Sequence, residues 1–98
     1  MELKDLTNVQ IEDLNGIWET KRPSQPDIIF RFENGRLNVF GLSNQGTISE
    51  AVKLNPISAE RADLVGSEIS HIELLTNKFL VIKNSKGFYL LLVKSSTN

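Results

Sequence analysis

The sequence predicts a mainly β protein: an antiparallel up-and-down β-barrel, or a strongly curved meander, of about seven strands with a short N-terminal helix. Apolar and polar residues alternate through most of the chain, which is the pattern of half-buried strands. Short turn signals separate these segments, so consecutive strands are expected to be antiparallel neighbours. A chain of 98 residues with 40% hydrophobic content is large enough for one core and too small for two. We therefore expect a single domain over residues 1–98.

Residues 3–14 favour a short helix or turn. Thr7 and Gln10 match the spacing of a capping box, and apolar residues recur near helical spacing. Gly16 interrupts this pattern, and residues 17–21 are expected to form the first strand. That strand ends at the segment KRPSQP, because proline cannot donate a hydrogen bond to a sheet ladder.

The clearest β signal is a hairpin around Asn34 and Gly35. Residues 28–33 alternate strictly, with an isoleucine and both phenylalanines on one face. The Asn-Gly pair that follows is the preferred two-residue turn between paired strands. Residues 36–42 form the second arm, SNQG gives the next turn, and residues 47–54 are expected to form a third arm.

The regular alternation lapses between Asn55 and Ser67. The segment PISAERADLVG is either a short helix, with Ser58 as N-cap and Gly66 as C-terminal glycine, or an irregular crossover, and the local signals favour the helix. A meander of this length either closes or leaves two exposed edges, so closure, or a homodimer paired through a sheet edge, is expected. Alternation resumes in three strands separated by tight turns, at residues 69–76, 79–83 and 88–94.

Composition excludes several kinds of function. The formal net charge is -1, with 11 basic and 12 acidic residues spread along the chain, so nucleic acid and anionic membranes are not expected partners. The chain has no cysteine and only one histidine, so neither a disulfide nor a metal site is expected. The chain begins with alternating charge instead of the apolar run of a secretory signal, and its longest apolar runs are too short to cross a membrane as a helix. We therefore expect a cytoplasmic protein, or a chain from which a signal has been removed.

The triplet Gly16-Ile17-Trp18 opens the first expected strand directly after the N-terminal helical segment. A Gly-x-Trp triplet at this position of an antiparallel meander resembles the lipocalin-like (calycin) superfamily, which also contains the fatty-acid-binding proteins and the avidins. The resemblance implies that the tryptophan seals one end of a barrel beneath a ligand cavity. It also implies a basic partner for the tryptophan on a late strand, where Lys83 and Lys94 are available and neither aligns clearly. Classical members are longer and have more strands than are expected here.

The size of the inward side chains decides whether the barrel is filled or hollow. Most of them are bulky, and their burial is the main source of stability for a small domain, which favours a filled core over a small-molecule cavity. Gly41 is the main inward position that leaves space. The expected inward set comprises Trp18, Phe30, Phe32, Leu37, Val39, Val52, Leu54, Ile72 and Leu74.

Six residues are the candidates for ligand binding. Glu50 shares a strand face with Ile48 and Val52, so its carboxylate either points inward, where it would orient a ligand or act as an acid or base, or is turned to solvent by a bulge or a strand end. The outward orientation is favoured. Tyr89 is expected at the rim with its hydroxyl in solvent, and His71 is expected on the outer face. The apolar walls would be formed by Trp18, Phe30, Phe32 and Val39.

These features favour a small non-enzymatic binding protein that holds a small hydrophobic molecule in the barrel. The alternative is a protein-interaction module, such as an inhibitor, immunity or adaptor protein, with a filled core and recognition through loops or a sheet edge, where Phe40 and Ile29 would be contacts. A partly open barrel for single-stranded nucleic acid ranks third, since no basic groove with exposed aromatics can be drawn. No nucleophile-base pair, phosphate-cradling loop or metal set is recognisable, so no enzyme, catalytic residue or cofactor is expected.

Overall fold

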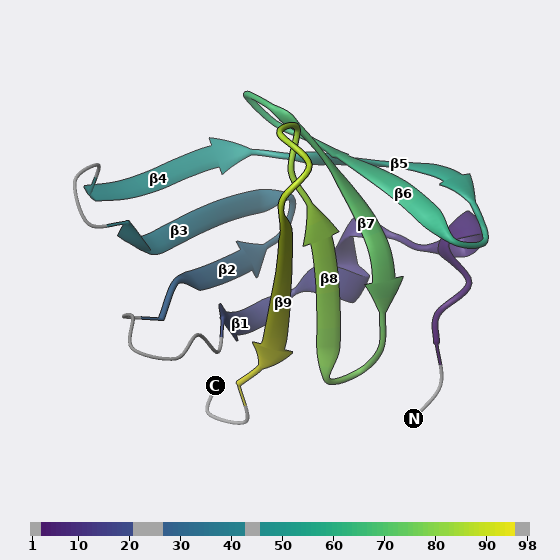
Figure 1. Ribbon diagram of the computed structural model, residues 1–98, viewed down its shortest axis with the longest axis horizontal. Coiled ribbons are helices and arrows are strands. Elements are labelled where there is room, and N and C mark those ends of the chain that lie inside the picture. Colours follow the sequence, from purple (N-terminus) through teal and green to yellow (C-terminus); the bar gives the residue numbers. More distant parts are fainter. Residues whose placement is uncertain (1–2, 21–26, 43–45, 96–98) are drawn as a thin grey trace.

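Nine antiparallel strands form a nearly closed barrel (Figure 1). The computed structural model describes residues 3–20, 27–42 and 46–95, and within them the hydrogen-bonded strand order is β4-β3-β2-β1-β9-β8-β7-β6-β5. The mainly β prediction is confirmed, although the expected number of strands, about seven, is too low. The strands are β1 (Gly16–Thr20), β2 (Ile29–Glu33), β3 (Arg36–Leu42), β4 (Gly46–Ala51), β5 (Lys53–Ser58), β6 (Arg61–Val65), β7 (Ile69–Leu75), β8 (Phe79–Lys83) and β9 (Tyr89–Lys94).

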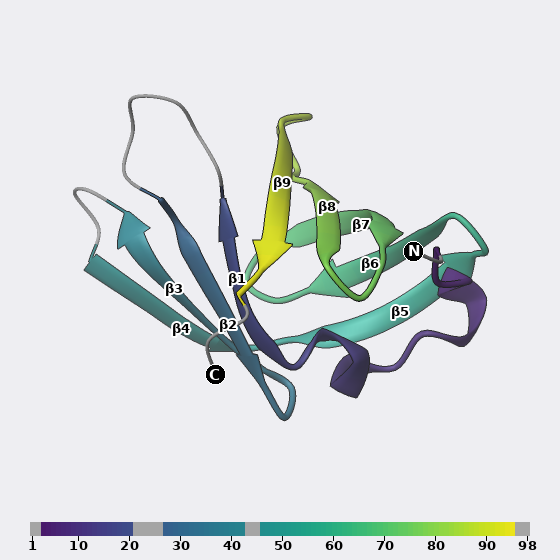
Figure 2. The same cartoon turned by 90° about the horizontal axis from the view of Figure 1, so that it is seen from below.

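The barrel closes because its first and last strands pair and its two outermost strands are halves of one bent strand. β1 pairs with β2 on one side and with β9 on the other. β4 and β5 are separated only by Val52, and they lie end to end in both views (Figures 1 and 2). The first half pairs with β3 and the second with β6, so the strand changes partner at its bend. The order is therefore that of an up-and-down meander wrapped round on itself.

The predicted helix near Ser58 is wrong. Its residues form the end of β5, a tight turn and β6, and the Ser58 hydroxyl accepts a 3.2 Å hydrogen bond from the backbone N–H of Glu60 within that turn. Ala62 and Leu64 are buried between neighbours that are more exposed, which is the alternation of a strand. β6 pairs with β5 on one side and β7 on the other, so cross-strand pairing overrides the local helix signals.

The N-terminal segment forms two 3-10 turns, η1 (Leu6–Asn8) and η2 (Ile11–Leu14), instead of the expected helix. It runs along β5 before it reaches β1 (Figure 2), and the backbone N–H of Leu6 donates to the carbonyl oxygen of Ala59 at 3.0 Å. Its buried residues are Leu6, Val9 and Leu14. Val9 and Gln10 have extended backbone angles and separate the two turns, so the segment is not one continuous helix even though its buried residues recur at helical spacing.

The inward faces of the strands meet in one hydrophobic core. Leu74 is a correction: a register shift between Ile72 and Leu74 turns it to the outer face opposite Val81, and Leu75 is buried in its place, with 1% of its surface exposed. The other residues predicted to face inward are placed as expected. Trp18, Phe32, Leu37, Val39, Val52 and Ile72 are buried, and Phe30 and Leu54 are partly buried against them.

Gly41 bends β3 and does not leave space inside the barrel, which corrects its expected role. Its φ is +88°, and the register between β3 and β4 shifts between Val39 and Leu42. A Cβ at this position would lie 2.5 Å from the carbonyl oxygen of Asp27. Glycine fits here because it accepts both the backbone angle and the close approach of another chain segment.

Candidate ligand-binding site

Trp18 closes one end of the barrel. Its side chain is fully buried, and its indole N–H donates a 2.8 Å hydrogen bond to the carbonyl oxygen of Leu14 at the end of η2. The pairing of β1 with β9 places Lys94 directly opposite Trp18. The ammonium of Lys94 lies 5.1 Å from the centre of the Trp18 ring and donates to the carbonyl oxygen of Asn15 at 3.0 Å. Lys94, and not Lys83, is therefore the late-strand base beside the tryptophan.

Gly16 has a physical reason to precede this tryptophan. Its φ is +131°, an angle that residues with side chains rarely adopt, and a Cβ here would lie 2.7 Å from Cε of Lys94. The glycine therefore leaves room for the stem of Lys94. Trp18 follows two positions later on the same strand face and supplies the ring beside the ammonium.

A cavity of about 390 Å³ lies inside the barrel. Ser67 and Glu68 of the β6–β7 turn line the cavity and are exposed, so the cavity opens to solvent beside this turn. The volume is within the range of small-molecule sites, and the interior is partly hollow although the sequence favours a filled core. The apolar lining consists of Ile28, Phe30, Leu37, Val39, Ile48, Val52, Leu64, Ile82 and Leu90.

The carboxylate of Glu50 lines this cavity. β3 and β4 are in register here, with Leu37 opposite Glu50, so the inward face of β4 continues through Glu50. The favoured outward orientation required a bulge or a strand end at Glu50. The irregularity in this strand pair lies farther along, between Val39 and Leu42, and the pairing continues past Glu50 to Ala51. The Ser67 hydroxyl donates to Oε2 of Glu50 at 2.7 Å, and the Ser67 backbone N–H donates to the same oxygen at 3.4 Å.

The contact between Glu50 and Ser67 crosses a seam in the barrel wall. β4 is hydrogen-bonded through its backbone to β3 on one side. On its other side, among the residues described, the Glu50 side chain joins it to the β6–β7 turn. Gly66 packs directly against this carboxylate, and a Cβ at position 66 would collide with Oε1 of Glu50. Side chains therefore complete the wall where the backbone ladder stops.

The structure brings three of the six candidate residues together and separates the other three. Phe30, Val39 and Glu50 line the cavity. Trp18 and Phe32 belong to the buried core, and β1–β2 pairing sets Phe32 opposite Gly16 at the closed end. Tyr89 lies outside, 59% exposed, with the ammonium of Lys83 5.4 Å from the centre of its ring. Tyr89 faces outward because it pairs with Lys83 on the outer side of the β8–β9 ladder.

Several cavity residues were not among the candidates. Ile48 and Leu90 could have been found by extending the alternation of β4 and β9. Leu64 could not, because the segment that contains it was expected to be helical. Ser70 could also have been found, because it shares the inward face of β7 with Ile72. Ser67 carries no local signal, since its place depends on how the β6–β7 turn meets β4.

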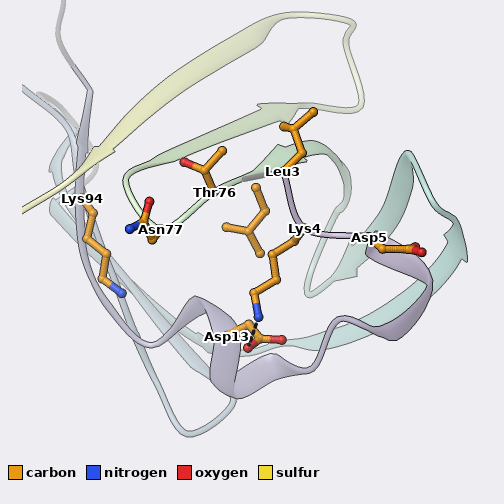
Figure 3. A pocket seen from close by; sticks show the side chains of 8 residues that line it. Leu3, Lys4, Asp5, Asp13, Thr76, Asn77 and Lys94 are labelled. Carbon is orange, nitrogen blue, oxygen red and sulfur yellow. Dashed lines mark hydrogen bonds and ion pairs between the residues drawn. The ribbon is translucent and has the colours of Figure 1, made fainter. Parts of the chain in front are cut away.

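A second hollow, of about 650 Å³, lies at the closed end between the N-terminal segment and the β7–β8 turn (Figure 3). Lys4 and Asp13 form a 3.0 Å ion pair on one side of it, Lys94 lies at its edge, and Leu3 is 67% exposed. Six of its eight lining residues are charged or polar, whereas small-molecule sites are mostly apolar with a few placed polar groups. The smaller interior cavity is therefore the better candidate.

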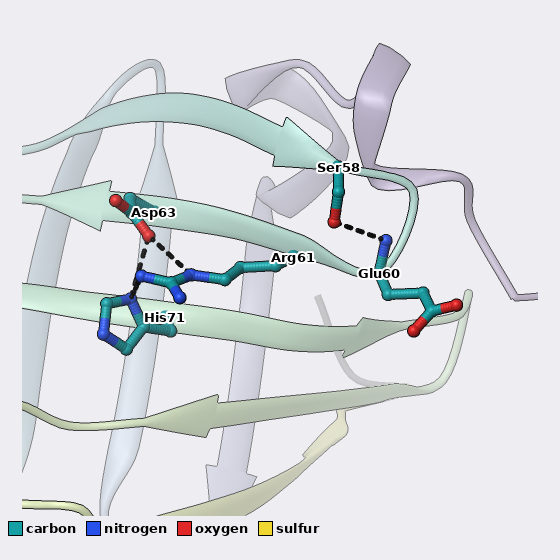
Figure 4. A network of polar contacts seen from close by, with 5 residues as sticks. All are labelled: Ser58, Glu60, Arg61, Asp63 and His71. Carbon is teal, nitrogen blue, oxygen red and sulfur yellow. Dashed lines mark hydrogen bonds and ion pairs between the residues drawn. The ribbon is translucent and has the colours of Figure 1, made fainter.

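A polar network lies on the outer face of β6 and β7 (Figure 4). Nδ1 of His71 is 2.8 Å from Oδ1 of Asp63, and Nε of Arg61 donates to the same oxygen at 3.3 Å. The hydrogen bond from His71, with a further contribution from Arg61, holds the pKa of Asp63 below its ordinary value of 3.8. The network ties neighbouring strands together on the surface and lies outside the interior cavity.

The lowered pKa of Asp63 predicts a loss of stability in acid. A carboxyl group whose pKa is lower in the folded state stabilises the fold above its unfolded-state pKa, here 3.8, and this contribution disappears as the pH falls through the folded-state value. We expect Asp63→Asn to make the free energy of unfolding fall less steeply between about pH 5 and about pH 2, measured by urea titration. Glu60→Gln is the control, because the Glu60 carboxylate points away from Asp63 and His71 (Figure 4). A decline as steep in Asp63→Asn as in the wild type would contradict this account.

A scan against protein-family models and searches of curated proteins and of solved structures found no match to this chain. Within the residues that the structure describes, no helix has the length and apolar character to cross a membrane. In the same residues, no group of three or more His, Asp or Glu side chains is placed to hold a metal ion.

Proposed function

We propose that this protein is a small non-enzymatic binding protein that holds a small hydrophobic molecule inside the barrel. The cavity of about 390 Å³ carries the proposal. Its walls belong mainly to paired strands, so little ordering is required when a ligand enters. Displacing water from apolar walls such as Phe30, Val39 and Ile48 would contribute about 25 cal/mol per Å² of apolar surface.

The closed end supports a lipocalin-like arrangement. Gly16 makes room for Lys94, Lys94 lies over Trp18, and the N-terminal turns cover that end with buried leucines. A tryptophan and a late-strand base that seal the barrel beneath the ligand are what the resemblance to that superfamily implies. The proposed ligand site is the hollow part of the barrel beside the β6–β7 turn.

Filling the cavity should abolish binding. We expect Ile48→Phe to weaken the binding of a neutral, environment-sensitive fluorescent dye by about tenfold or more, because the added ring would occupy the space that the dye needs. Fluorescence titration measures the dissociation constant, and circular dichroism verifies that the variant is folded.

Ile57→Phe is the matched control for this experiment. It makes the same substitution on β5, where Ile57 is 53% exposed and outside the cavity lining. Its affinity for the dye should stay within about twofold of the wild type, since surface substitutions have small effects. A wild type that binds no apolar probe, or equal losses in both variants, would overturn the proposed function.

Recognition of a protein partner is the second candidate, and an exposed apolar strip favours it. Tyr89 and Leu91 on the outer face of β9 are more than half exposed, and Phe88 precedes them at 66%. Large apolar residues grouped on a surface often mark an interface. Leu91→Asp should remove any stoichiometric partner that the wild type retains in a pull-down. A partner retained by both proteins would show that recognition lies elsewhere.

A further inference from the structure

We propose that the ligand is an apolar amine in its cationic form, with its ammonium group on Glu50 and its apolar part in the cavity. The inference rests on the proposed function and names the chemical class of the ligand.

The charges that line the cavity are all negative. Among the described residues of the lining, Glu50 and Glu68 are charged, and no lysine, arginine or histidine contributes. The nearby cations are directed away: Nε of Arg36 donates to Ser49 at 3.1 Å, and Lys83 lies over Tyr89 outside the barrel. A fatty acid would bring a third carboxylate to this site, and like charges repel more strongly where water is partly excluded.

The carboxylate of Glu50 has acceptor capacity left for a ligand. An ionised carboxylate has about four lone-pair sites on its two oxygens. Within the described chain, both donors to Glu50 belong to Ser67, and both reach Oε2. Oε1 lies beside Gly66, so close that a side chain at position 66 would overlap it. An alkylammonium group carries three N–H donors and is suited to this remaining oxygen.

Ser67 acts as a positioning residue. Its hydroxyl and backbone N–H hold one oxygen of the carboxylate against the β6–β7 turn, so the carboxylate stays at the mouth of the cavity. Ser70 also lines the cavity and offers a hydroxyl oxygen to a second N–H of the ligand. Apart from these groups, Glu68 and Asn84, the side chains that line the cavity are apolar and fit a short alkyl or aryl body.

Three ligands with the same tail separate this inference from binding in general. Octylamine, octanol and octanoic acid are each used at neutral pH to displace the neutral dye from the full-length protein. We expect octylamine to bind about tenfold more tightly than octanol, because a charge-assisted hydrogen bond is stronger than a neutral one, and octanoate to bind most weakly.

Glu50→Gln removes the charge of this side chain and keeps its shape and its ability to accept from Ser67. In this variant octylamine should bind within about threefold of octanol, while the affinity for octanol stays at the wild-type value. Glu60→Gln, on the exposed β5–β6 turn, makes the same change outside the cavity and should keep the preference for the amine.

The possible failures are distinguishable. If octanol and the dye bind but octylamine binds no better than octanol, the amine inference is wrong and the proposed function stands. A preference for octylamine that survives in Glu50→Gln also overturns the inference, since another group must then recognise the ammonium. If neither the dye nor any octyl compound binds, the proposed function itself fails.

Discussion

Replacing Trp18 by alanine is expected to lower the free energy of unfolding by about 3–5 kcal/mol, a large fraction of the stability of a small domain. The Trp18 side chain is fully buried, so its loss leaves a cavity in the core. It also removes the donor to the carbonyl oxygen of Leu14 and the ring beside Lys94. Urea unfolding should be followed by far-ultraviolet circular dichroism, because the substitution removes the only tryptophan of the chain.

Two further variants keep this prediction testable if the alanine variant does not fold. Trp18→Phe retains an aromatic ring but loses the indole N–H, and we expect an intermediate loss of about 1–3 kcal/mol. Phe88→Ala removes an aromatic side chain that is 66% exposed and should change stability by less than about 0.5 kcal/mol. Similar losses in Phe88→Ala and the Trp18 variants would show that Trp18 does not anchor the closed end.

Replacing Gly16 by alanine is expected to destabilise the protein by about 1–3 kcal/mol from backbone strain alone, because its φ of +131° is unfavourable for any residue with a Cβ. A second cost arises from the stem of Lys94, whose Cε would lie 2.7 Å from the new Cβ. Lys94 would have to leave its place beside Trp18 and Asn15. Urea unfolding of the variant measures both effects together.

A double-mutant cycle separates the two costs. In a Lys94→Ala background the steric conflict is absent, so Gly16→Ala should be less destabilising there than in the wild type, by about 1 kcal/mol. The backbone strain remains in both backgrounds. Strictly additive losses would mean that Gly16 does not make room for Lys94, and that its conformation alone requires glycine.

The hairpin at Asn34 and Gly35 is predictable from the sequence because its signals are local. Both residues have positive φ values, 49° and 81°, which suit asparagine and glycine in a two-residue turn. The alternation on either side of the turn leads to the pairing of Phe30 with Val39, two of the cavity residues. This part of the site therefore follows from neighbouring residues alone.

Other parts depend on contacts between distant segments. Arg61–Val65 is a strand because β5 and β7 lie on either side of it, although its local signals favour a helix. The choice of Lys94 over Lys83 depends on the pairing of β1 with β9, and the direction of Leu74 depends on a bulge. Ser67 meets Glu50 across 17 positions of the chain, at a place that no short pattern specifies.

Beside the bend at Val52, the barrel wall can open without breaking backbone hydrogen bonds between paired strands. β4 and β5 exchange partners there, so beside Glu50 the described wall is held by two hydrogen bonds from a single serine. Separating two strands that are neighbours in the sheet would instead break several backbone hydrogen bonds together. A ligand or water should therefore enter and leave the interior here. Amide protons around the β6–β7 turn should exchange with deuterium sooner than those of β1 and β9.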